Sequence, residues 1–145
     1  MKKILISCIE ASADLLTAAL IEKIPDWRNR FHFYGLGGKH LKALGISVLE
    51  DMTPQSTMGF LEPLLKLPFY FKKLNLIKQV LVKEKPDALW VVDAQGFHLP
   101  LIRFAKQKLN LPVIYFISPQ SWQWGKAEEA LKFSKDIDLI IDVFP

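Results

Sequence analysis

Residues 88–98, Ala-Leu-Trp-Val-Val-Asp-Ala-Gln-Gly-Phe-His, combine a buried-strand pattern with a charge at its end. The first five residues are apolar without polar alternation, which is typical of a strand buried on both faces of a parallel sheet. Asp93 follows at once, where open α/β sheets bind ligands beyond the carboxyl ends of their strands. Two interpretations stay open: Asp93 contacts a ligand, or it is an ordinary turn or helix-capping residue.

Similar apolar runs alternate with helical patterns along the whole chain. Further strands are expected at residues 2–8, 31–34, 46–49, 111–117 and 139–143, and helices at 13–24, 39–44, 69–83, 99–109 and 126–134. Strands that alternate with helices imply right-handed crossovers and a parallel sheet. The predicted fold class is therefore α/β, a doubly wound, mostly parallel, Rossmann-like sheet that forms a single domain over residues 1–145.

Composition excludes several classes of protein. The chain has 145 residues, of which 50% are hydrophobic and 23% charged, with a net charge of +4, so it is neither disordered nor fibrous. It lacks Arg/Lys runs, which argues against nucleic acid, and its apolar stretches are too short to span a bilayer. Cys8 is its one cysteine, in keeping with a reducing cytoplasm. No metal-ligand spacing and no glycine-rich dinucleotide fingerprint occurs, so no metal or cofactor is expected.

Polar residues follow several of the expected strands and should gather at one edge of the sheet. Ser12 is expected to cap the first helix, with Asp14 in its first turn. Residues 35–38, Gly-Leu-Gly-Gly, indicate a loop that serves as a tight turn or lets a ligand approach closely. Trp122 and Trp124 follow the fifth strand, and they should pack either on the rim of the sheet or on a ligand.

Residues 60–74 mix large apolar side chains with lysines. Pro63 and Pro68 are expected to break this stretch into short pieces before a regular helix begins near Phe69. One interpretation is a helix that packs on the core and exposes its lysines. The other is a membrane-surface patch, comprising Phe60, Leu64, Leu65, Phe69, Phe71, Lys72 and Lys73.

Five motifs, in order along the whole chain, resemble those of the lipid-A-disaccharide synthase family. The first motif is Glu10-Ala-Ser-Ala-Asp14, and the second is the glycine stretch at residues 35–38. The third is Met58-Gly59 with Glu62, and the fourth runs from Lys85-Pro-Asp87 to Asp93-Ala94 and Phe97. The fifth is Ser118-Pro119 with Trp122 and Trp124. The chain departs from the family pattern at Ile9, Ala13, Gly96, His98 and Gly125.

The resemblance implies the acceptor-side, N-terminal domain of an inverting GT-B glycosyltransferase. Such an enzyme joins UDP-diacylglucosamine to diacylglucosamine 1-phosphate in lipid A biosynthesis, without a cofactor or metal. The UDP-sugar-binding C-terminal domain would be absent from this chain, which would be inactive alone as a fragment, split-enzyme half or remnant. The implied location is cytoplasmic and peripheral, at the inner face of the bacterial inner membrane, with the lipid acceptor as partner.

The resemblance also assigns roles to residues. Asp93 would be the catalytic base that takes the proton of the acceptor hydroxyl. The substrate-binding residues would be Glu10, Ser12, Asp14, Met58, Gly59, Glu62, Ser118, Trp122 and Trp124. Because Gly96 and His98 replace the Asp and Asn of the family, a GT-B enzyme with another sugar acceptor is a second interpretation. An inactive lipid- or partner-binding module is a third.

Overall fold

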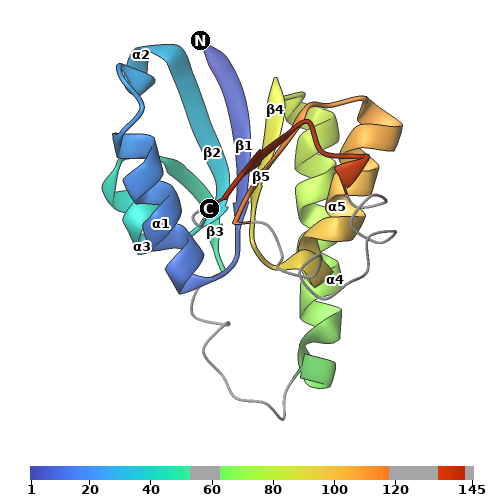
Figure 1. Ribbon diagram of the computed structural model, residues 1–145. Helices are drawn as coiled ribbons and strands as arrows, with labels where there is room; N and C mark the ends of the chain where they lie inside the picture. Colours follow the sequence, from blue (N-terminus) through green and yellow to red (C-terminus); the bar gives the residue numbers. More distant parts are fainter. Residues whose placement is uncertain (53–62, 118–133, 143–145) are drawn as a thin grey trace.

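The computed structural model describes residues 1–52, 63–117 and 134–142, and the observations below concern these residues. Strands and helices alternate along them (Figure 1). In chain order the elements are β1 (Lys2–Cys8), α1 (Ala11–Glu22), α2 (Trp27–Arg30), β2 (Phe31–Gly37), α3 (Lys39–Ala43), β3 (Ser47–Asp51), α4 (Pro63–Glu84), β4 (Ala88–Val92), α5 (Gln95–Leu109), β5 (Val113–Phe116) and β6 (Leu139–Ile141). The predicted helix at 126–134 lies almost wholly outside the described residues.

The six strands form one sheet in the order β3-β2-β1-β4-β5-β6, and every neighbouring pair is parallel. The chain first builds outward from β1 to β3 and then returns to β4, on the other side of β1. Right-handed crossovers consequently place α1 and α3 on one face and α4 and α5 on the other (Figure 1). This topology confirms the predicted doubly wound, Rossmann-like sheet, and its switch point lies between β1 and β4.

Side chains at alternate positions of the central strands pack into two separate cores, one on each face of the sheet. Leu5, Leu89 and Val91 pack with Ile77 and Leu81 of α4 in the first core. Neighbouring positions on the same strands turn to the opposite face, where α1, α2 and α3 cover them. This second core includes Ile4, Ile6, Ala18, Ile21, Trp27, Leu41, Trp90 and Val92. Burial on both faces explains why β1 and β4 are apolar without alternation.

The predicted break in the stretch with two prolines was wrong. The stretch with two prolines is a single helix, because α4 begins at Pro63 and contains Pro68. Pro63 occupies the first helical position, where its missing N–H has no partner to lose. Pro68 is exposed in the second turn, and the buried face that includes Leu74 and Ile77 offsets its cost, roughly 3 kcal/mol in a helix interior.

The glycine stretch after Tyr34 is also not a loop, since β2 continues to Gly37. Gly35 has φ +139°, and a Cβ there would lie 2.0 Å from the carbonyl oxygen of Ile6 on β1. The pairing with β3 shifts register between Gly35 and Leu36, as at a β-bulge. A glycine in this strand is therefore required by the close approach of the β1 backbone.

Candidate active site at the switch point

Two carboxylates follow the central strands at the switch point. Glu10 comes two residues after Cys8 of β1, Asp93 directly follows Val92 of β4, and Cys8 and Val92 are paired across the sheet. Burial raises the pKa of Glu10 above its usual value, and the nearby negative charge of Asp93 raises it further. The topology thus brings together two acidic groups that are 83 residues apart in the sequence, at the place where this type of sheet binds ligands.

The backbone of Asp93 adopts a conformation that is rare for a residue with a side chain. Asp93 has φ 49° and Ala94 has φ 47°, so two consecutive non-glycine residues are left-handed. The N–H of Asp93 donates to the carbonyl of Phe116 on β5 at 2.9 Å. The turn after β4 is therefore bent sharply and tied to the next strand, and Asp93 as a residue is half-buried.

Three buried side chains hold this turn in place through a chain of hydrogen bonds. The Nδ1 atom of His98 lies 2.6 Å and the hydroxyl of Tyr115 lies 2.8 Å from the carbonyl oxygen of Asp93. The Nε2 atom of His98 is 2.8 Å from Oγ of Ser7 on β1. Burial lowers the pKa of His98 to about 4, so its imidazole is neutral at pH 7. Burial also raises the pKa of Tyr115, helped by the charges of Asp93 and Glu10, so its hydroxyl stays a donor.

The sequence pattern did not single out Ser7 or Tyr115. Ser7 is a fully buried polar residue within an apolar strand, and this mismatch is the one signal that could have identified it. His98 was expected near the start of a helix that begins at residue 99. The helix begins four residues earlier, at Gln95, which places His98 inside its first turn and beneath Asp93.

The first strand-to-helix turn differs from the expectation for Ser12. Helix α1 begins at Ala11, its N-cap residue is Glu10, and no side chain caps it. Ser12 is an exposed residue of the first turn, so its prediction as the N-cap was wrong. The thiol of Cys8 donates to the carbonyl oxygen of Glu10 at 3.6 Å, and burial raises the pKa of Cys8 to about 12. The Cys8 thiol is therefore protonated at neutral pH.

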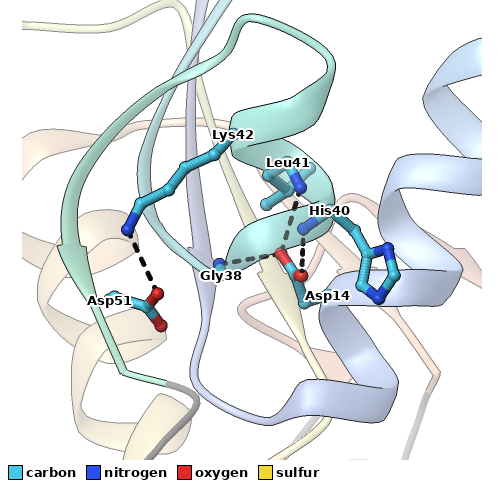
Figure 2. A network of polar contacts seen from close by, with 6 residues as sticks. All are labelled: Asp14, Gly38, His40, Leu41, Lys42 and Asp51. Carbon is cyan, nitrogen blue, oxygen red and sulfur yellow. Dashed lines mark hydrogen bonds and ion pairs between the residues drawn. The ribbon is translucent and has the colours of Figure 1, made fainter.

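Asp14 is buried and holds another helix in place. One carboxylate oxygen accepts the N–H groups of Gly38 at 2.7 Å and Leu41 at 3.3 Å, and the other accepts that of His40 at 2.8 Å (Figure 2). These are the N–H groups at the start of α3, which have no partners within that helix. Asp14 therefore caps α3 from α1, and its substrate-binding role stays a prediction.

Several predicted site residues lie outside the described residues: Met58, Gly59, Glu62, Ser118, Trp122 and Trp124. Their substrate-binding roles stay predictions. Within residues 1–52, 63–117 and 134–142, no group of three His, Cys, Asp or Glu side chains is arranged to hold a metal ion. The described site thus consists of Asp93 and Glu10, supported by Ser7, His98 and Tyr115.

The predicted membrane patch divides into residues with different surroundings. Phe71 is 61% exposed and Leu67 is 44% exposed on the first half of α4, and Lys72 is exposed beside them. Phe69 packs partly against the core, and Lys73 lies over its ring and forms an ion pair with Glu50. Phe60 is outside the described residues, as are the side chains of Leu64 and Leu65. No helix in the described part of the chain has the length and apolar character needed to cross a membrane.

An all-parallel sheet with this strand order, and with its candidate site at the switch point, defines a Rossmann-like α/β domain. The sequence profile described as lipid-A-disaccharide synthetase matches residues 4–145. The chain therefore belongs to the lipid-A-disaccharide synthetase family, which confirms the resemblance of the five motifs.

Individual relatives agree with this assignment. Lipid-A-disaccharide synthase 1 of Legionella pneumophila (strain Paris) is 38% identical over 144 residues, which are 99% of this chain and 37% of the relative. The Persephonella marina lipid-A-disaccharide synthase is 35% identical over 147 residues, covering 100% of this chain and 36% of the relative. The chain thus spans little more than a third of the length of these relatives.

One solved structure shares the fold. The crystal structure of Acinetobacter baumannii MurG matches with a TM-score of 0.61 and 14% identity, over 100% of this chain and 42% of that chain. At this identity the likeness concerns the fold alone.

Proposed function

We propose that this chain is the acceptor-side part of an inverting GT-B glycosyltransferase of the lipid-A-disaccharide synthase type. The complete enzyme would transfer diacylglucosamine from UDP-diacylglucosamine to diacylglucosamine 1-phosphate, and UDP would leave. The UDP-sugar would be bound by the part of the family's length that this chain does not span. Family membership supports the reaction, and the carboxylate of Asp93 at the switch point is the observation that carries its mechanism.

Asp93 is the proposed general base. An inverting transfer needs a group that takes the proton of the acceptor hydroxyl as that oxygen attacks the anomeric carbon. Asp93 is a half-buried residue at the edge where parallel sheets bind ligands, so a bound sugar hydroxyl could reach it. Glu10 stands beside it, and its pKa is raised chiefly by burial and further by the negative charge of Asp93.

The test is Asp93→Asn in this chain joined to the remaining portion of a family member, with release of UDP as the assay. Loss of a general base typically lowers the rate by about 10²–10⁴-fold, and we expect a loss in this range. Activity within about threefold of the parent would remove Asp93 from the catalytic role, since that lies far below the usual effect. The 145-residue chain alone should show neither transfer nor UDP binding at micromolar concentration in calorimetry.

A matched control is Asp26→Asn. Asp26 is exposed and also left-handed, with φ 55°, but it follows α1 at the end of that helix opposite Glu10. The same substitution in the same backbone conformation should therefore leave the rate unchanged. A comparable loss in both variants would point to a general effect on folding and count against Asp93 as the base.

The proposed lipid acceptor calls for contact with a membrane surface, and the first half of α4 is the surface we assign to it. Leu67 and Phe71 are four residues apart and share one face of the helix. Lys72 next to them could meet lipid phosphates, at about 1 kcal/mol per lysine near an anionic surface. The proposed location is the cytoplasmic face of the inner membrane, with α4 directed toward the headgroups.

A further inference from the structure

We propose that His98 and Tyr115 are positioning residues for Asp93: both hold its carbonyl oxygen, and this grip fixes the direction of its Cα–Cβ bond and so limits where its carboxylate can lie. The inference rests on the proposed function only in taking Asp93 as the reacting group. His98 stands where the family resemblance places an asparagine, so the arrangement concerns this chain's own residues. Both side chains contact the main-chain carbonyl of Asp93, and they act on its carboxylate through the backbone.

The grip offsets a local conformational cost. A left-handed residue with a side chain costs roughly 1–2 kcal/mol, and Asp93 and Ala94 are both left-handed. Such strain persists only where surrounding structure enforces it. Here the Asp93 carbonyl receives donors from α5 and β5, while its N–H is held by Phe116. With both sides of the residue fixed, its Cα–Cβ bond has a single direction relative to the end of β1.

The hydrogen bonds determine the tautomer of the His98 ring. A carbonyl oxygen can only accept, so Nδ1 must carry the proton that it donates to Asp93. With the ring neutral, Nε2 has no proton and accepts from the hydroxyl of Ser7. Ser7 is fully buried on β1 and thereby links the turn after β4 to the strand that leads to Glu10. This chain of contacts joins the turn after β4 to β1 through a neutral, buried support.

Fixing this direction has a chemical consequence. Burial is the largest cause of the raised pKa of both Glu10 and Tyr115, and the charge of Asp93 raises each of them further. A base must meet the hydroxyl it deprotonates within hydrogen-bond reach, about 2.6–3.2 Å. If the grip were lost, the turn could relax and the carboxylate would leave its place beside Glu10. The titration of Glu10 therefore reports the position of Asp93 without any need for catalysis.

The experiment uses the 145-residue chain labelled with ¹³C and ¹⁵N. Long-range ¹⁵N–¹H correlation should identify His98 as the neutral Nδ1–H tautomer at pH 7, and an Nε2–H tautomer would overturn the proposal. The carboxyl carbon of Glu10 is then titrated in the parent, in His98→Phe and in Tyr115→Phe. In both variants we expect the midpoint of Glu10 to move down by more than about 0.3 pH units, toward its usual value, as the repulsion from Asp93 weakens.

Tyr34→Phe is the matched control. The Tyr34 hydroxyl is buried and has no hydrogen-bond partner in the described part of the chain, and its loss should leave the Glu10 midpoint in place. A midpoint that shifts by less than about 0.3 units in either gripping variant, with an intact fold, contradicts positioning. So does an equal shift in the control. Amide spectra confirm the fold, and Tyr115→Phe supplies the test by itself if His98→Phe does not fold.

The outcome of this experiment does not depend on whether the proposed function is correct. If Glu10 titrates as expected but Asp93→Asn retains activity in the joined enzyme, the grip stands and Asp93 is not the base. If Asp93→Asn is inactive while the Glu10 midpoint does not move, Asp93 stays the base and the positioning role fails.

Discussion

The carboxylate of Asp14, on α1, accepts a hydrogen bond from the backbone N–H of Gly38, 24 residues away, at 2.7 Å. His40 and Leu41 donate to the same side chain, so one carboxylate supplies three backbone partners at the start of α3. We predict that Asp14→Ala lowers the free energy of unfolding by about 2–4 kcal/mol, because it leaves buried N–H groups without a hydrogen-bond partner. Urea denaturation measures this loss.

The exposed residue Asp26 provides the comparison for Asp14. Its carboxylate accepts only from the side chain of Asn29 among the contacts of the described residues, so Asp26→Ala should cost less than about 1 kcal/mol. Equal effects of the two substitutions would contradict the assigned role of Asp14 as a cap across elements.

A second prediction concerns Gly35. An alanine there would place its Cβ against the Ile6 carbonyl in a backbone conformation that strongly favours glycine. Gly35→Ala should therefore cost about 3 kcal/mol or more, or prevent folding, as measured by thermal unfolding. Gly96→Ala is the control, because a Cβ added to this residue of α5 would meet nothing within 4 Å. It should change the free energy of unfolding by less than about 1 kcal/mol, and the expected direction is an increase, because glycine is less favourable than alanine inside a helix.

A third prediction concerns the dependence of stability on pH through His98. Its pKa is about 4 in the fold and near 6.5 when unfolded, so the unfolded state binds the proton first as the pH falls. Its contribution to stability is complete above pH 6.5 and is lost between pH 6.5 and 4, at up to about 1.4 kcal/mol per pH unit. The raised pKa of Glu10 has the opposite effect on stability. Just above the usual pKa of Glu10, the folded state binds more protons than the unfolded state, so stability rises as the pH falls.

The comparison that isolates His98 is urea denaturation of the parent and of His98→Phe at several pH values. The variant should lose less stability than the parent as the pH falls from 6.5 to 4. Parallel profiles for the parent and His98→Phe would show that the buried imidazole does not titrate in this way.

A fourth prediction concerns the membrane surface assigned to α4. The chain should sediment with vesicles that contain anionic lipid, and less so at high salt, because screening weakens the attraction of Lys72. Phe71→Ser should lower the bound fraction at least about threefold, since it removes an exposed aromatic ring from the contact. Val82→Ser, which changes a residue 50% exposed near the other end of the helix, should have no effect.

The vesicle experiment has two outcomes that oppose the membrane role. Binding that is equal for the parent and Phe71→Ser would assign the first half of α4 to ordinary surface. Absence of binding by the parent at low salt would do the same, because the positive charge and exposed ring would then have no measurable affinity for lipid.

The sequence by itself determined the alternation of strands and helices, the doubly wound class and the family. Apolar runs such as residues 88–92 carry that information locally, because a strand buried on both faces has no polar positions. The same run ends at Asp93, so the position of this carboxylate at the edge of the sheet was also predictable. The continuity of α4 through Pro68 was not, because propensity favours a break and only packing of the face that includes Leu74 and Ile77 offsets it.

Only the tertiary structure decided what surrounds Asp93. The proximity of Glu10, the grip of His98 and Tyr115, and the link to Ser7 join residues separated by up to 91 positions. No local pattern encodes such contacts, since each depends on strand order and on the register of β1, β4 and β5. The role of Asp14 was decided in the same way: its place in a first helical turn suggested a local charge effect, whereas the packing of α1 beside α3 made it the cap of another helix.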